Sequence, residues 1–225
     1  MVFHLWTNAR ALGGQEPFDA AVREIHHMPY LHLLEAGILL PLLFHAGYGV
    51  KLALEARHNV TKYNTSRNWA FTLQRITGLL AFAFILYHLY GLWWPKVTGK
   101  LAAENFYPRL CEQMSATYAG MPLHAFAYIL GIAACVYHFA NGLWGFCFSW
   151  GITVSKRAQR TAAWVFGLVG VAVLCLGVNT VLHFATGKGL LEDQLMGGDN
   201  HSSGRTCNDI RAEALKARAE QATNP

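Results

Sequence analysis

The sequence predicts an all-α integral membrane protein, a helical bundle with four full transmembrane helices. Of its 225 residues, 53% are hydrophobic and only 14% are charged, and the mean hydropathy of +0.23 exceeds that of a typical soluble domain. Four stretches are long enough to cross a bilayer, because a spanning helix needs about 20 apolar residues. We expect these helices over residues 30–54, 69–94, 121–150 and 162–184.

The distribution of charge gives the spans an orientation. Loops 51–68 and 151–161 together hold seven Lys or Arg residues against one glutamate, whereas segments 7–29 and 95–120 hold five. Basic loops stay on the cytoplasmic side, so we expect the first pair to face the cytoplasm, in a multi-pass protein of the cell inner membrane. No basic stripe with stacking aromatic residues indicates nucleic acid, despite the net charge of +5.

The five cysteines form neither a CxxC pair nor a CxxCH motif, which excludes covalent c-type haem, a zinc ribbon and a ferredoxin-like cluster. Cys111 and Cys207 both fall on the predicted outer side, so the topology allows a disulfide between them. We divide the chain into a transmembrane domain, residues 1–187, and a polar tail, residues 188–225. The tail is expected to be partly disordered or to form a short surface helix around residues 209–221.

Three histidines stand in the middle of predicted spans, where an unpaired imidazole is costly and therefore usually has a partner or a role. Each follows an aromatic residue and precedes, by three or four positions, a glycine on its own helical face. Such a glycine clears a patch where a flat ring can approach the backbone. The histidines are His45, His88 and His138, and the glycines are Gly49, Gly91 and Gly142.

Depth in the membrane sorts these histidines into pairs. His45 and His138 each lie about 9–12 residues, or roughly 14–18 Å, from the cytoplasmic end of their helix, so they are level. His88 belongs near the outer face, where His4 is the candidate partner. Two pairs at two depths in a helical bundle can hold two b-type haems inside it, each ligated by two imidazoles. A hydrogen-bonded core histidine would be the simpler interpretation of any one residue alone.

Several runs of the sequence resemble a known family. LPLLFHAGYGV, YNTSRNWAFTLQRITG, LYHLYG and YHFANGLWGFCFSWGITVSKRAQR are similar to the diheme cytochrome b membrane subunit of succinate dehydrogenases and fumarate reductases, of the single-subunit, five-helix kind. The similarity extends over about residues 2–185. It implies His4 and His88 as ligands of a distal haem, and His45 and His138 as ligands of a proximal haem.

The resemblance also implies a function and partners. The chain would be the membrane anchor and electron-transfer subunit of a succinate:quinone oxidoreductase, with the dicarboxylate active site on another subunit. A flavoprotein with FAD and an iron–sulfur subunit would dock on the cytoplasmic face. Electrons would pass between the iron–sulfur clusters, the two haems and a membrane quinone.

Two positions depart from relatives in this family. Some fumarate reductases carry a glutamate, thought to conduct protons, two residues before the histidine of helix four, where this chain has Val136. Near the distal haem, some relatives use an acidic residue to protonate quinone, where this chain has His26 with Glu24 close by. We therefore expect His26 and Glu24 at the quinone site and no proton route through Val136.

Arg75 is a charge inside a predicted span, 13 residues or about 20 Å before His88 on the same helix. This places it level with the cytoplasmic edge of the proximal haem. We expect its guanidinium to pair with a haem propionate, which would offset its desolvation. The alternative is that the side chain extends to lipid phosphate.

The first six residues are apolar but would rise only about 9 Å, far less than the hydrocarbon thickness of about 30 Å. Because the following residues resemble the family's continuation from its first helix, we expect residues 1–6 to be the C-terminal end of a truncated first helix. A short natural helix held by its neighbours is the alternative.

Two other functions compete with this interpretation. The chain could be the cytochrome b subunit of a formate dehydrogenase or hydrogenase, also a diheme helix bundle that reacts with quinone. A haem-free membrane anchor or transporter is the second alternative, and it predicts a colourless protein. The HFANGLW run and the five-helix count favour the succinate dehydrogenase and fumarate reductase family over the first of these.

Overall fold

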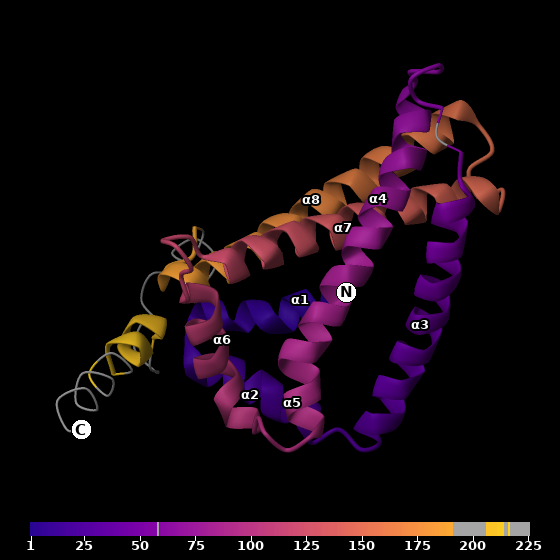
Figure 1. Ribbon diagram of the computed structural model, residues 1–225. Coiled ribbons are helices and arrows are strands. Elements are labelled where there is room, and N and C mark those ends of the chain that lie inside the picture. The colour runs from indigo at the N-terminus through magenta and orange to yellow at the C-terminus, as the bar shows by residue number, and fades with distance from the viewer. Residues whose placement is uncertain (58, 191–205, 214–215, 217–225) are drawn as a thin grey trace. The chain divides into compact units, whose positions relative to one another are not determined.

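The computed structural model describes residues 1–57, 59–190, 206–213 and 216. Its long elements are all helices, and in the described residues the β-structure is limited to one isolated bridge between Tyr118 and Met121. Four helices are long and apolar enough to cross a membrane, which confirms the predicted all-α membrane architecture. They are α3 (Leu31–Glu55), α4 (Ser66–His88), α7 (Leu123–Ser149) and α8 (Lys156–Thr186) (Figure 1).

Two of these helices begin earlier than predicted because polar residues cap them. The Thr65 side chain accepts a hydrogen bond from the Asn68 backbone N–H at 3.4 Å, so α4 begins at Ser66. Ser155 Oγ accepts from the Ala158 N–H at 3.1 Å. The polar residues 156–161, predicted as loop, are therefore the first turns of α8. Both starts were missed because the prediction followed apolar content, whereas helix ends are fixed by caps.

The second span is not a regular helix throughout. A π-helical turn, η2 (Leu89–Trp93), directly follows His88 and leads into the short helix α5 (Trp94–Val97). Pro95 has no N–H to donate to the carbonyl of Gly91, four residues earlier, and its ring crowds that carbonyl. A widened turn relieves this conflict. The sequence predicted a uniform helix to residue 94, and its proline explains the difference.

The chain divides into two compact units. The described residues of 1–29, 90–129 and 176–225 form unit 1, and residues 30–89 and 130–175 form unit 2. Unit 1 contains the shorter elements together with one end of α7 and of α8. These shorter elements are α5 together with α1 (Val2–Ala9), η1 (Arg10–Gly13), α2 (Gln15–His26), η3 (Ala103–Asn105) and α6 (Phe106–Ser115).

Unit 1 is built around a cluster of aromatic rings. Phe18 of α2, Tyr107 of α6 and Phe184 of α8 contact one another with ring centroids 5.4–5.8 Å apart. Tyr107 is fully buried, and its hydroxyl lies 3.1 Å from Nε2 of the buried His183. This contact satisfies the phenol inside the core. His183, in the last turn of α8, is therefore a core residue of this unit.

The polar tail is attached to unit 1 in two ways. A disulfide joins Cys111 of α6 to Cys207, as the topology allows. Residues 207–213 are helical, and Arg211 donates to the carbonyls of Phe184 and Ala185 at 2.7 Å each, near the end of α8. Residue 216 is also helical. The remaining residues of the predicted 209–221 helix lie outside the described part of the chain.

The disulfide makes a direct prediction about thiol content. Denatured, unreduced protein should take up maleimide at three cysteines, Cys135, Cys147 and Cys175, and at all five after reduction. A Cys111→Ser/Cys207→Ser variant should take up three under both conditions. It should also melt at a lower temperature, because a cross-link over a loop of this length stabilises by about 4–5 kcal/mol in loop-entropy terms. Five labels before reduction would contradict the pairing.

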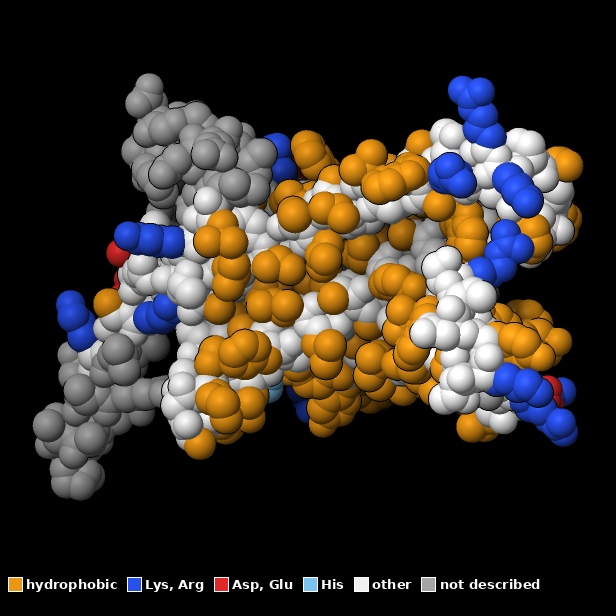
Figure 2. Space-filling view, turned by 90° about the horizontal axis from the view of Figure 1, so that it is seen from above, with side chains coloured by type: hydrophobic (Ala, Val, Ile, Leu, Met, Phe, Trp, Pro, Cys, Tyr) orange, Lys and Arg blue, Asp and Glu red, His pale blue; other side chains and the backbone are white. Residues whose placement is uncertain are grey.

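Unit 2 is formed by α3, α4, and the parts of α7 and α8 within it. Its α4 and α7 approach closely where the Phe84 ring lies against Gly131, a position at which any Cβ would collide with the ring. The C-terminal ends of α3 and α7 and the N-terminal ends of α4 and α8 lie at the same end of unit 2 (Figure 1), and Lys and Arg gather at this end beyond a hydrophobic surface (Figure 2). This is the grouping expected of a cytoplasmic end.

Candidate functional site

His138 of α7 is held by hydrogen bonds to α4 inside unit 2. Its Nδ1 lies 3.0 Å from the backbone carbonyl of Gln74, which assigns the ring proton to Nδ1. The Gln74 side chain donates back to the His138 carbonyl at 3.1 Å, and its Nε2 lies 3.5 Å from the imidazole Nε2. Asn141 donates to Gln74 Oε1 at 2.7 Å. The ring is thus fixed with Nε2 carrying the lone pair.

A glycine on the neighbouring helix makes this arrangement possible. A Cβ at Gly78 would lie 2.9 Å from Cε1 of His138 and 3.1 Å from Nδ1, so the ring reaches the Gln74 carbonyl only because Gly78 has no side chain. Sequence reasoning missed Gly78 and Gln74. Their four-residue spacing in LQRITG, which places both on one helical face, was the available signal.

Two of the three glycines predicted to clear space on the histidines' own helices can be described by what an added Cβ would meet. A Cβ at Gly142 would meet Gln74 Nε2 at 3.2 Å, so this glycine makes room for the glutamine side chain. A Cβ at Gly49 would meet nothing within 4 Å. Their predicted role beside a bound ring stays a prediction.

His45 of α3 faces His138 although the two lie 93 positions apart in the chain. Their ring centroids are 6.0 Å apart and the rings are nearly perpendicular, at 75°. α3 has no buried residue, so His45 is exposed on a helix that packs against α4. Among the described residues no group of three or more His, Cys, Asp or Glu could hold a metal ion. The potential ligands brought together here are the two imidazoles of His45 and His138.

The other predicted ligands lie on different units. His88 is the last residue of α4, in unit 2, with its ring 5.9 Å from that of Phe84. His4 lies on α1 in unit 1, where Asn8 Nδ2 donates to its carbonyl at 2.8 Å. Their pairing stays a prediction. Arg75 lies over the Phe71 ring, 3.2 Å from its centroid, and donates to the Phe71 carbonyl at 2.8 Å.

The predicted quinone residues differ in their surroundings. Nδ1 of His26 lies 2.8 Å from the Val22 carbonyl, and its buried Nε2 has no hydrogen-bond partner among the described residues. Its ring lies 6.0 Å from that of Phe106, within unit 1. Glu24, two residues earlier, is exposed. Val136, at the position of the relatives' glutamate, is 4% exposed and lies near Gly170 of α8.

Asp19 is a buried carboxylate that sequence reasoning missed. It is 7% exposed on α2, where Gln15 Nε2 donates to one oxygen at 3.1 Å. The other oxygen has no partner in the described residues. Burial raises the pKa of this carboxyl, and the hydrogen bond from Gln15 opposes the shift only in part. A single aspartate in an amphipathic helix gave no signal of its burial.

The raised pKa predicts a pH dependence of stability. Because folded Asp19 holds its proton more tightly than the unfolded chain does, its contribution to stability is lost as pH rises through the folded-state pKa. An Asp19→Asn variant should lack this loss, so it should melt higher than wild type at pH 8 and similarly at pH 4. Glu16→Gln, an exposed change on the same helix, is the control. Equal pH profiles for Asp19→Asn and wild type would contradict the prediction.

The fold and site define a multi-pass membrane protein with a paired-imidazole site between its helices. Residues 55–178 match the family described as succinate dehydrogenase/fumarate reductase transmembrane subunit, and the chain belongs to that family. It is 36% identical over 186 residues to the succinate dehydrogenase cytochrome b558 subunit of Bacillus subtilis (strain 168), covering 82% of this chain and 88% of that protein. No solved structure matches it.

The chain is therefore a membrane subunit of a succinate:quinone oxidoreductase. This confirms the family indicated by its sequence runs. The competing assignments, to a formate dehydrogenase or hydrogenase and to a haem-free anchor, are not favoured.

Proposed function

We propose that this subunit carries b-type haem and conducts electrons between an iron–sulfur subunit and a membrane quinone. The observation that carries the proposal is the pair His45 and His138, with ring centroids 6.0 Å apart. A separation of this size leaves room for one metal ion between the two rings, because a ring nitrogen binds a metal ion at about 2.0–2.1 Å. The cytochrome b558 name of the Bacillus subtilis relative also supports haem.

The surroundings of His138 suit an axial ligand. Ligating histidines almost always donate their second ring N–H to a carbonyl or carboxylate, which fixes the ring and strengthens the ligand. The Gln74 carbonyl at 3.0 Å from Nδ1 supplies this partner, and Gly78 leaves room for the ring. A haem held by His45 and His138 would accept and release one electron. Arg75 would pair with one of its propionates.

A second haem, between His4 and His88, rests on the depth argument and the family resemblance. Both histidines would lie near the outer face. The π-turn that starts directly after His88 is a further point in favour, because such turns are frequent at functional sites. Gly91, within that turn, has Gln113 as the nearest group to its missing side chain. Two haems at two depths would let electrons cross the membrane.

The partner subunits are proposed to dock at the cytoplasmic end of this subunit. The iron–sulfur subunit, with a flavoprotein that carries FAD and the dicarboxylate site, would dock over loops 51–68 and 151–161 on the cytoplasmic side of the cell membrane. The Cys111–Cys207 disulfide lies in unit 1, with the segment assigned to the outer side. Disulfides persist in oxidising compartments, so its position supports this orientation.

Replacing either histidine of the proposed proximal pair should remove one haem and spare the other. We expect His45→Ala and His138→Ala complexes to hold about half the wild-type haem per protein and to lack one redox transition. His32→Ala is a matched control on α3, because His32 is exposed beside Glu35. Both transitions persisting in His138→Ala would overturn the pairing.

Gly78→Ala tests the positioning of His138 separately from ligation. Because the added methyl would lie 2.9 Å from Cε1, the ring must shift and its bond to the Gln74 carbonyl must lengthen. The expected result is a changed midpoint potential of the proximal haem, since the carbonyl tunes the ligand. Gly145→Ala, where a Cβ meets nothing within 4 Å, is the control. Identical potentials in both variants would argue against this role.

His26 is proposed to hydrogen-bond the quinone through its unpartnered Nε2. His26→Leu should raise the KM for quinone roughly fivefold, because a lost hydrogen bond costs about 1 kcal/mol. Haem content and succinate oxidation with a soluble dye should stay unchanged. His27→Leu is the matched control, since His27 makes the same Nδ1 contact, to Arg23 at 2.7 Å, but is exposed. Equal KM values for the two variants would remove His26 from the site.

A further inference from the structure

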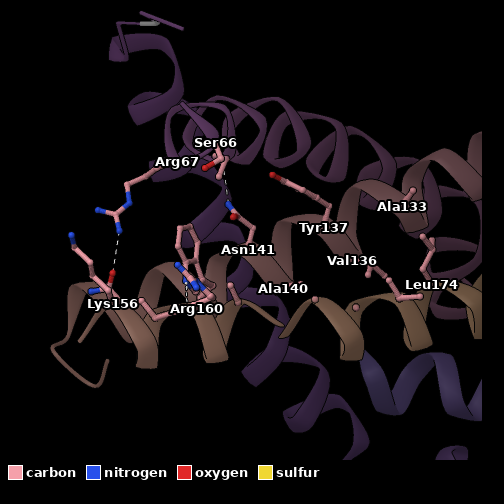
Figure 3. Close-up of a pocket in the computed structure, with 17 residues that line it drawn as sticks. Ser66, Arg67, Ala133, Val136, Tyr137, Ala140, Asn141, Lys156, Arg160 and Leu174 are labelled. Atoms are coloured by element: carbon pink, nitrogen blue, oxygen red, sulfur yellow. Dashed lines mark hydrogen bonds between the residues drawn. The ribbon is translucent and has the colours of Figure 1, made fainter. Parts of the chain in front are cut away.

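A cavity of about 720 Å³ lies within unit 2, lined by α4, α7 and α8. Its lining differs from the surroundings of the His45–His138 pair, because it combines a strongly basic end with a largely apolar interior. Figure 3 shows Arg67, Lys156 and Arg160 at one end, and Ala133 and Leu174 at the other. The basic end belongs to the loops assigned to the cytoplasmic side.

Within the described part of the chain, no carboxylate forms an ion pair with the three cations at the mouth. The ion pairs His32–Glu35 and Lys51–Glu55 involve other groups. Arg67 instead donates to Gln159 Oε1 at 3.1 Å and lies 4.9 Å from the centroid of the Phe148 ring. The first residues of α4 and α8, Ser66 and Lys156, also line the mouth, so the positive ends of two long helix dipoles point there. The mouth therefore favours an anion.

Beyond the polar groups of Tyr137 and Asn141, the interior of the cavity is lined by small and apolar residues. Ala133, Ala140, Ala163, Gly167 and Gly170 leave a groove beside Val136 and Leu174. A Cβ at Gly167 would meet nothing within 4 Å, so the groove is open at that level. From Arg160 to Leu174, α8 rises about 21 Å, which is deeper than the roughly 15 Å of hydrocarbon in one leaflet.

We propose that this cavity binds an anionic phospholipid of the cytoplasmic leaflet. The phosphodiester would lie among Arg67, Lys156 and Arg160, and one acyl chain would fill the groove along α8. Basic pockets between transmembrane helices on this side suit acidic headgroups. The depth of the groove favours lipid over an acidic surface of a protein partner, which would stop at the membrane surface. Three cations favour a phosphate over the neutral head of a quinone.

The test is native mass spectrometry of the intact complex, first delipidated and then incubated with dioleoyl phosphatidylglycerol or dioleoyl phosphatidylcholine. We expect one phosphatidylglycerol to be retained and no phosphatidylcholine. Lys156→Gln/Arg160→Gln should lower phosphatidylglycerol retention at least tenfold. The single variant Arg160→Lys, which keeps Lys156 and preserves both charges, should retain the lipid as wild type does. Arg157→Gln is the matched control, because Arg157 is adjacent in sequence but does not line the cavity.

A second variant tests the groove without changing charge. Gly167→Leu should also abolish retention, because its side chain would occupy the space of the acyl chain. Gly145→Leu, which adds the same side chain outside the cavity, should not. Subunit content and dithionite-reduced haem absorbance, measured on the same samples, show that each variant is assembled.

Three results would overturn the proposal. If the charge variants and the groove variant all retain phosphatidylglycerol as wild type does, the lipid binds elsewhere. Loss of the iron–sulfur subunit in Lys156→Gln/Arg160→Gln, with lipid still retained, would assign the cations to the protein interface. Loss of co-purified quinone in Gly167→Leu, with phosphatidylglycerol still retained, would assign the groove to quinone.

Discussion

The hydrogen bond from His138 Nδ1 to the Gln74 carbonyl is the constraint on which the site depends. It requires α4 and α7 to lie close enough for an imidazole to reach a neighbouring backbone, and Gly78 and Gly131 each remove a side chain that would prevent this. In hydrocarbon, helices gain little from burying apolar groups against one another, so such packing and interhelical hydrogen bonds largely determine association. Two further hydrogen bonds connect the same helices, from the Gln74 side chain to the His138 carbonyl and from the Asn141 side chain to Gln74 Oε1.

The four spans could be predicted from the sequence because the length of apolar helix that a bilayer needs follows from one constant, the rise per residue along a helix. The helix starts at Ser66 and Lys156 were missed because a capping hydroxyl, rather than apolar content, decides them. The π-turn after His88 differs from the predicted uniform helix because Pro95 distorts the turn that precedes it. Each error concerns an end or a local distortion, and the spans themselves are unaffected.

The orientation of residues around a helix was harder to predict than their depth. Gly142 shares a face with His138, but that face is occupied by Gln74 of the neighbouring helix. Gly78, which the ring does contact, is far away in the sequence. Contacts between two helices depend on how each helix is rotated about its own axis relative to its neighbour. The spacing of residues within one helix does not determine this rotation. Asp19 is a similar case, because its burial depends on the elements packed over α2.

Asn141 connects the histidine site to the basic cavity. It lines the cavity and also donates to Gln74 Oε1 and to the Ala70 carbonyl. Water entering the cavity would compete for these donors, and a hydrogen bond is weaker in water than in a dry interior. An acyl chain in the groove would exclude that water and keep Gln74 bonded to α7. On the proposed functions, the lipid would therefore help hold the ligand orientation of His138 without contacting it.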